Sequence, residues 1–121
     1  MKKILIVDDK ISISRLIVQF LSKTFDVITK EDGLQAISWL HSGNIPDLII
    51  TDLQMPNMDG FELISRLKES GFFRDIPIVV LSSKDSSNDR IKCLKMGAVD
   101  FLLKPFNPEE LLIRIERILE R

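Results

Sequence analysis

The chain has 121 residues, of which 45% are hydrophobic and 29% charged, and its formal net charge is −1 at pH 7. This length and composition are typical of one globular domain with one core, and acids and bases are interspersed, so the net charge gives no support for binding nucleic acid or a membrane surface. The longest apolar stretches have the size of strands, far below the roughly 20 residues of a membrane-spanning helix.

The first half of the chain alternates between strand and helix patterns. The apolar run at about residues 3–7 predicts a strand. The stripe that follows has the i, i+3, i+4, i+7, i+8 spacing of an amphipathic helix. It consists of Ile13, Leu16, Ile17, Phe20 and Leu21. A short strand is predicted at 26–29. Asp32, with Gln35 three residues later, then predicts the cap of a second helix that runs through about His41.

The second half continues the alternation with six more elements. In order, they are a strand at about 47–51, a helix at about 59–70, a strand opened by Pro77, a short polar helix at about 86–95, a strand at about 99–103 and a last helix. Asp59 and Glu62 form a capping-box pattern at the start of the first of these helices. Asn107 as cap and Pro108 at the first helical position predict the start of the last helix.

This alternation predicts an α/β domain with a parallel sheet and right-handed crossovers. Three of the predicted strands are nearly continuous apolar runs, which is the pattern of strands covered by helices on both faces. These runs are Ile4 to Val7, Leu48 to Thr51 and Ile78 to Leu81.

Four of the predicted strands end in polar residues of particular kinds. Asp8 and Asp9 follow the first strand, Asp52 the third, Ser82 the fourth and Lys104 the fifth. Ligands of an open parallel α/β sheet bind at the carboxyl ends of its strands, so these side chains are expected to converge. Each of them alone is better explained as a helix cap or a turn residue. Their joint occurrence at four strand ends favours a functional site.

The chemistry of this set suits a divalent cation and a phosphoryl group. Clustered carboxylates resist ionising together, and a bound cation removes that penalty. Carboxylate and carbonyl oxygens are hard ligands that suit Mg²⁺, and the sequence has no cluster of histidine and cysteine that would suit zinc. A lysine beside them adds a point charge that can hold a phosphate oxygen.

At these residues the sequence strongly resembles the receiver domain of two-component response regulators. The resemblance covers the whole chain, residues 1–121, as one domain. Its motifs are Ile6-Val7-Asp8-Asp9, the segment from Asp52 to Gly60, Ser82, and the segment from Gly97 to Phe106. It implies a single doubly wound, flavodoxin-like domain, with a five-stranded parallel sheet in the order 2-1-3-4-5 flanked by five helices.

The same resemblance implies a signalling switch rather than an enzyme. Such a domain accepts a phosphoryl group from a sensor histidine kinase or a phosphotransfer protein, and it promotes its own phosphotransfer and autodephosphorylation. Asp52 looks like the phosphoacceptor, a carboxylate nucleophile that becomes an aspartyl phosphate. Asp9 and Asp52 would ligate Mg²⁺ (or Mn²⁺) directly together with the backbone carbonyl of Gln54, and Asp8 would act through a metal-bound water. Lys104 would pair with the phosphoryl oxygens, and the bond from it to the following proline is expected to be cis, as in relatives.

Four further roles follow from the resemblance. Ser82 and Phe101 match a switch pair, in which the phosphoryl group attracts the serine hydroxyl and the aromatic ring fills the space that the moving loop leaves. An immobile core aromatic is the alternative interpretation of Phe101. Gln54 and Lys84 match the positions that flank the attacking water and tune dephosphorylation.

A candidate dimer face carries four charged residues. They resemble positions that pair across a dimer in the subfamily attached to winged-helix DNA-binding domains. They are Arg90, Asp100, Glu110 and Arg114. The face would consist of the helix at about 86–95, the strand at about 99–103 and the last helix, and it would form a homodimer after phosphorylation. Val99 departs from the pattern, because an acid is usual there. Ordinary solvated charge is the alternative, since exposed pairs contribute little.

Other classes of protein fit the sequence less well. A receiver-like module that binds partners without phosphorylation would not need the complete acidic set with Lys104. A flavin-binding module would need a phosphate loop rich in serine, threonine and glycine after the first strand, where the sequence has Asp8-Asp9-Lys10-Ile11-Ser12. A haloacid-dehalogenase-type phosphatase expects its two acids two residues apart, whereas these acids are adjacent.

The location of the protein is indicated by two further features. Met1-Lys2-Lys3 leads directly into a short strand, without the long apolar segment and cleavage site of a signal peptide. The single cysteine, Cys93, cannot form a disulfide within the chain, which fits a reducing cytosol. We therefore expect a cytoplasmic protein that binds neither membranes nor nucleic acid directly.

Overall fold

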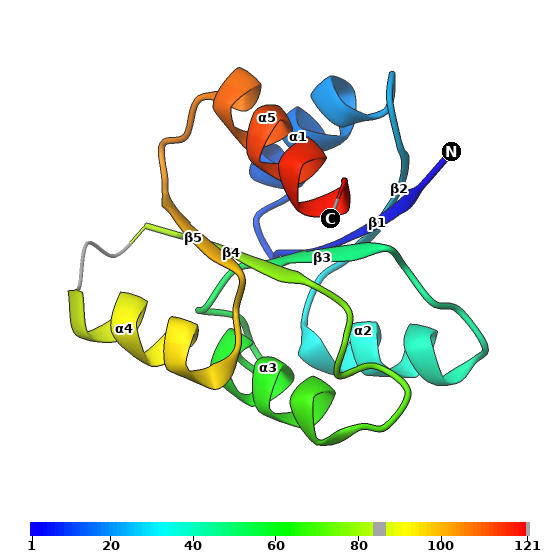
Figure 1. Cartoon of the computed structure of the whole chain (residues 1–121), viewed down its shortest axis with the longest axis vertical. Helices are drawn as coiled ribbons and strands as arrows, with labels where there is room; N and C mark the ends of the chain where they lie inside the picture. Colours follow the sequence, from blue (N-terminus) through cyan, green and yellow to red (C-terminus); the bar gives the residue numbers. More distant parts are fainter. Residues whose placement is uncertain (84–86, 121) are drawn as a thin grey trace.

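A parallel sheet in the order β2-β1-β3-β4-β5 forms the centre of the molecule. The alternation of strands and helices predicted its parallel character, and the resemblance to receiver domains implied its strand order. The computed structural model describes residues 1–83 and 87–120 (Figure 1). The strands are β1 (Lys3–Val7), β2 (Asp26–Lys30), β3 (Leu48–Thr51), β4 (Ile78–Ser82) and β5 (Asp100–Leu103). The helices are α1 (Ile11–Leu21), α2 (Gly33–His41), α3 (Gly60–Glu69), α4 (Ser87–Met96) and α5 (Pro108–Leu119).

Helices cover both faces of the sheet. Figure 1 shows α1 and α5 on one face and α2, α3 and α4 on the other. Successive side chains of a strand point to opposite faces, so each central strand contributes to two cores. In β1, Ile4 and Ile6 belong to the core beneath α1 and α5, whereas Leu5 and Val7 belong to the core on the other face. The continuous apolar runs are therefore explained by burial on both sides.

The helix ends confirm most of the predicted capping. Asp32 Oδ1 accepts the backbone N–H of Gln35 at 2.9 Å at the start of α2. The Gln35 side chain reaches back one residue further than a capping box requires, because its Oε1 accepts the N–H of Glu31 at 3.2 Å. At α5, Asn107 Oδ1 accepts the N–H of Glu109 at 2.8 Å.

The fourth helix ends at Met96, within one residue of the approximate end that the sequence predicted, and its predicted first residue lies outside the described residues. The helix continues to Met96 because Gly97 is the residue that turns the chain, with φ +111°. The N–H of Gly97 donates to the carbonyl of Leu94 at 3.1 Å, and the N–H of Ala98 donates to the carbonyl of Cys93 at 3.0 Å. This pair of bonds is a Schellman motif, which satisfies the last carbonyls of the helix.

Gly60 allows the loop after β3 to close against the start of α3. Its N–H donates to the carbonyl of Leu53 at 2.9 Å. A Cβ at this position would collide with the backbone carbonyl oxygen of Asp52 and would lie 2.8 Å from the Cα of Leu53. Both obstacles are backbone atoms, which cannot rotate away as the end of a side chain can.

We expect Gly60→Ala to lower the free energy of unfolding by about 1–3 kcal/mol, the usual cost of overpacking. Urea denaturation followed by circular dichroism measures this change. Gly71→Ala is the matched control, because a Cβ at Gly71 meets nothing within 4 Å. A Gly60 variant as stable as the Gly71 variant would show that the loop tolerates the added methyl group.

Within the described part of the chain, none of the helices combines the length and the apolar character that crossing a membrane requires.

Candidate functional site

Three carboxylates meet at the carboxyl edge of the sheet. Asp8 and Asp9 follow β1, and Asp52 follows the neighbouring strand β3. One carboxylate oxygen from each of the three lies within 4.8 Å of the others. Asp8 and Asp52 are 4% and 3% exposed, whereas Asp9 is exposed to solvent. The structure therefore brings together the acids that the sequence analysis singled out.

The backbone around Asp52 fixes the position of its carboxylate. Its N–H donates to the carbonyl of Val7 at 2.9 Å, which continues the pairing between β1 and β3. Its Oδ1 accepts the N–H of Leu53 at 2.8 Å, and its backbone carbonyl accepts the Thr51 hydroxyl at 2.9 Å. The other carboxylate oxygen, Oδ2, is the one that contacts charged side chains.

Lys104 places a buried ammonium group between two of the acids. Its Nζ lies 2.8 Å from Asp8 Oδ2 and 3.6 Å from Asp52 Oδ2, and its side chain is 7% exposed. Its N–H donates to the carbonyl of Ser82 at 2.8 Å, so the end of β4 holds the backbone of this lysine. The bond from Lys104 to Pro105 is cis, as expected from the resemblance.

Lys10 is a second lysine at the site, and its role there was not predicted from the sequence. Its Nζ lies 3.5 Å from Asp52 Oδ2 and 3.8 Å from Asp9 Oδ1. Burial disfavours its charged form, but the Asp52 and Asp9 carboxylates outweigh that effect and raise the pKa of Lys10. Its position directly after Asp8 and Asp9 was the one feature of the sequence that could have indicated a place at the site.

The donor set fits a hard divalent cation. Carboxylate oxygens from three residues lie close enough together to share one ion, and oxygen is the ligand atom that Mg²⁺ prefers. Gln54, which the resemblance assigns as the third protein ligand through its carbonyl, is exposed in the loop after Asp52.

A link between two loops holds the segment that follows Gln54. Asn57 adopts a positive φ of 66°, and its Nδ2 donates to Asp32 Oδ2 at 2.8 Å. The hydrogen bonds from the Gln35 backbone and from Asn57 outweigh burial and lower the pKa of Asp32. Asp32, predicted only as a helix cap, therefore also anchors the loop beside the acidic site.

Ser82 and Phe101 lie on the neighbouring strands β4 and β5. Ser82 is the last residue of β4 and is 2% exposed. Phe101 is half-buried, packs against the core beneath α2, α3 and α4, and has the Arg90 guanidinium carbon 5.8 Å from its ring centroid. The switch role of this pair stays a prediction. Lys84, the second residue predicted to tune dephosphorylation, lies outside the described residues.

The charged residues of the candidate dimer face make contacts within the chain. The Arg114 guanidinium donates to both carboxylate oxygens of Asp100, at 3.0 and 3.2 Å, and its Nε lies 3.5 Å from Glu110. Arg90 covers Phe101, as described above. The predicted homodimer would have to exchange or extend these contacts, and it stays a prediction.

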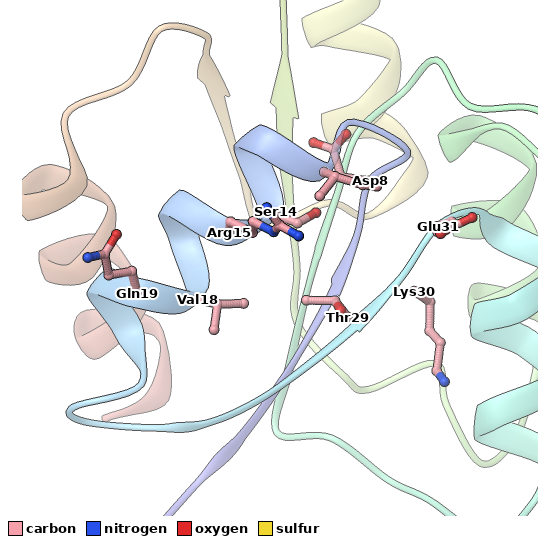
Figure 2. A pocket seen from close by; sticks show the side chains of 9 residues that line it. Asp8, Ser14, Arg15, Val18, Gln19, Thr29, Lys30 and Glu31 are labelled. Carbon is pink, nitrogen blue, oxygen red and sulfur yellow. The ribbon is translucent and has the colours of Figure 1, made fainter.

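A groove of about 400 Å³ between α1 and β2 borders the acidic site at Asp8 (Figure 2). Among the described residues, Ser14 Oγ is buried there without a hydrogen-bond partner. Figure 2 shows the Lys30 side chain pointing away from Ser14 and Arg15, so the polar groups of the groove do not converge on one point. The groove therefore forms a solvent-accessible surface between α1 and β2, beside Asp8.

The response regulator receiver domain family matches residues 4–116, and the chain belongs to this family. PhoP, the alkaline phosphatase synthesis transcriptional regulatory protein of Bacillus subtilis (strain 168), is 39% identical over 121 residues, which are 99% of this chain and 49% of PhoP. The chemotaxis response regulator CheY4 of Vibrio cholerae has a TM-score of 0.88 and 34% identity, with 98% of each chain covered. The receiver domain of the Francisella response regulator 1452 has a TM-score of 0.91 and 33% identity, over 100% of this chain and 98% of that one.

The chain spans about half the length of most curated relatives that it matches, and 7% of a hybrid signal transduction histidine kinase of Dictyostelium discoideum. Receiver domains are signalling domains of two-component systems, and they interact with histidine kinases or phosphotransfer proteins. They generally bind Mg²⁺ at an acidic pocket, and three aspartates of this chain lie close enough together to hold a metal ion.

Proposed function

We propose that this chain is a phosphorylation-activated switch in which Asp52 accepts a phosphoryl group from a phosphohistidine on a sensor histidine kinase or a phosphotransfer protein. The observation that carries the proposal is the environment of Asp52. Its side chain is 4% exposed, lies beside two other acids and has the Lys104 ammonium 3.6 Å from Oδ2. A buried nucleophilic carboxylate beside a buried cation is suited to receive a group that carries negative charge.

In the proposed transfer, a carboxylate oxygen of Asp52 forms the new P–O bond while the P–N bond of the phosphohistidine breaks. The electron pair of the broken bond stays on the imidazole nitrogen. Little covalent chemistry is required of the protein in phosphoryl transfer, so positioning and charge neutralisation supply most of the rate. The hydrogen bond from Leu53 N–H holds Asp52 in place, and Lys104 supplies a positive charge for the phosphoryl oxygens.

The metal site of the proposal uses the same acids. Asp9 and Asp52 would hold Mg²⁺ directly with the backbone carbonyl of Gln54, and Asp8 would act through a water. Mn²⁺ prefers similar oxygen ligands and would substitute for it. When bound, the ion neutralises charge on the phosphoryl oxygens.

The proposed switch runs from Ser82 to Phe101. Ser82 pairs with Leu103 across β4 and β5, and Phe101 pairs with Val80 in the same ladder. A shift of the Ser82 hydroxyl toward the phosphoryl group would therefore act on the strand that carries Phe101. Phe101 is half-buried and covered by Arg90 of α4, so its movement would alter the face formed by α4, β5 and α5. That face would transmit the signal, with a homodimer through Asp100 and Arg114 as the predicted form of output.

Intact-mass spectrometry after incubation with a small acyl phosphate tests the proposal. With Mg²⁺, we expect the addition of one phosphoryl group, and with excess EDTA we expect none, because the like-charged acids would then repel the incoming group. Gln54 and Lys84 would set the decay of the product, which the same measurement follows over time. No addition, even with a competent sensor kinase as donor, would favour the alternative of an interaction module that works without phosphorylation.

A further inference from the structure

We infer that Lys10 is a tethered counter-ion that occupies the place of the divalent cation between Asp9 and Asp52 and competes with Mg²⁺ for the site. This inference rests on the metal site of the proposed function. It assigns a role to a residue that the family motifs of this chain do not include.

The contacts of Lys10 coincide with the two carboxylates proposed as direct metal ligands. Its Nζ lies 3.5 Å from Asp52 Oδ2 and 3.8 Å from Asp9 Oδ1, so one ammonium group bridges both acids. Lys104 instead bridges Asp8 and Asp52. The two lysines thus share Asp52, but only Lys10 contacts Asp9, and so it contacts both carboxylates proposed to bind the cation directly.

Of the two lysines, Lys10 is the one able to leave. Mg²⁺ binds oxygens at about 2.0–2.1 Å, and a second cation on the same two carboxylates would repel it. The Lys10 side chain is 50% exposed, and its flexible stem can carry the ammonium into water at little cost. The Lys104 side chain is 7% exposed and lies 2.8 Å from Asp8, so it has no comparable path to solvent. Binding of Mg²⁺ would therefore displace Lys10 and leave Lys104 in place.

The backbone of Lys10 has a separate role, which a substitution would preserve. Its N–H donates to Asp8 Oδ1 at 2.9 Å, and its carbonyl accepts the N–H groups of Ile13 and Ser14, each at 3.1 Å, at the start of α1. Methionine at this position keeps these backbone bonds and an unbranched stem while it removes the charge. A Lys10→Met variant is therefore expected to fold.

Isothermal titration calorimetry with Mg²⁺ alone tests the inference. We expect Lys10→Met to bind Mg²⁺ about 3- to 10-fold more tightly than the wild type, as expected for the loss of two partly exposed ion pairs that compete with the metal. Lys10→Arg, which keeps the charge, should stay close to the wild type. Lys23→Met is the matched control, because Lys23 is exposed and, among the described residues, has no ion pair. It should leave the affinity unchanged.

Thermal unfolding provides a second readout that does not depend on phosphorylation. In EDTA, Lys10→Met should have a lower Tm than the wild type, because the acids lose a counter-ion. Saturating Mg²⁺ should raise the Tm of the variant by more than that of the wild type. Equal Mg²⁺ affinities in the two proteins would overturn this inference alone. Absence of binding by both would overturn it together with the metal site of the proposed function.

Discussion

Replacement of Asp52 by asparagine is expected to abolish the phosphoryl addition while the fold is retained. An amide is not a nucleophile for phosphorus, so no covalent intermediate can form. In the wild type, Asp52 Oδ1 accepts the N–H of Leu53 at 2.8 Å, and the asparagine Oδ1 can accept the same bond. The backbone pairing with Val7 does not involve the side chain. Lys104 and Lys10 keep Asp8 and Asp9 as partners, so neither ammonium is left without an acid. Intact-mass spectrometry with a small acyl phosphate and Mg²⁺ measures the loss.

The control for this experiment is an acid outside the site. Asp75 is exposed in the segment before β4, so Asp75→Asn removes the same charge without touching the candidate site. We expect normal phosphorylation of this control and an unchanged circular dichroism spectrum for both variants. Full phosphorylation of the folded Asp52→Asn protein would mean that another carboxylate, such as Asp8 or Asp9, is the acceptor.

The architecture could be predicted from the sequence because it depends on local patterns. Apolar runs of strand length, separated by helical stripes, leave few arrangements other than a parallel sheet covered on both faces. The polar residues at the strand ends then had to converge, since the carboxyl ends of parallel strands lie at one edge. The convergence of Asp8, Asp9 and Asp52 required no knowledge of side-chain geometry.

The contacts made by long side chains could not be predicted in the same way. Lys10 reaches Asp52, which is 42 residues away, and Asn57 reaches Asp32 across 25 residues. These contacts depend on how a turn directs a side chain and on which rotamer the surroundings allow. The Gln35 side chain is a short-range example of a contact that the sequence did not predict. Its Oε1 accepts the backbone N–H of Glu31 instead of the N–H of the cap residue Asp32.

The unequal environments of the two lysines explain why they are expected to act differently. Both ammonium groups lie near Asp52 Oδ2, at 3.5 Å for Lys10 and 3.6 Å for Lys104. Only the burial and the second partner differ between them. A half-exposed ammonium can leave when a stronger cation arrives, whereas a buried one stays where a phosphoryl oxygen would meet it.

Lys104→Met is accordingly expected to slow phosphoryl transfer to Asp52 by about 100-fold, the usual cost of removing one charge-stabilising group from an active site. Methionine fills a similar volume, so the change removes mainly the ammonium. It also leaves the Asp8 carboxylate, with its side chain 3% exposed, without its cation. Loss of one partner from a buried pair should lower the free energy of unfolding by about 3 kcal/mol, and Mg²⁺ should restore part of it.

A time course of intact mass at saturating Mg²⁺, together with urea denaturation, separates the two effects. The rate has to be compared under conditions in which both proteins are fully folded, so that the loss reports on the transfer step. Lys95→Met is the control, because Lys95 is exposed on α4 and, among the described residues, forms no ion pair with Asp8, Asp9 or Asp52. It should leave both the rate and the stability unchanged. A folded Lys104→Met protein with the wild-type rate would show that the buried charge positions Asp8 and does not stabilise the transferred phosphoryl group.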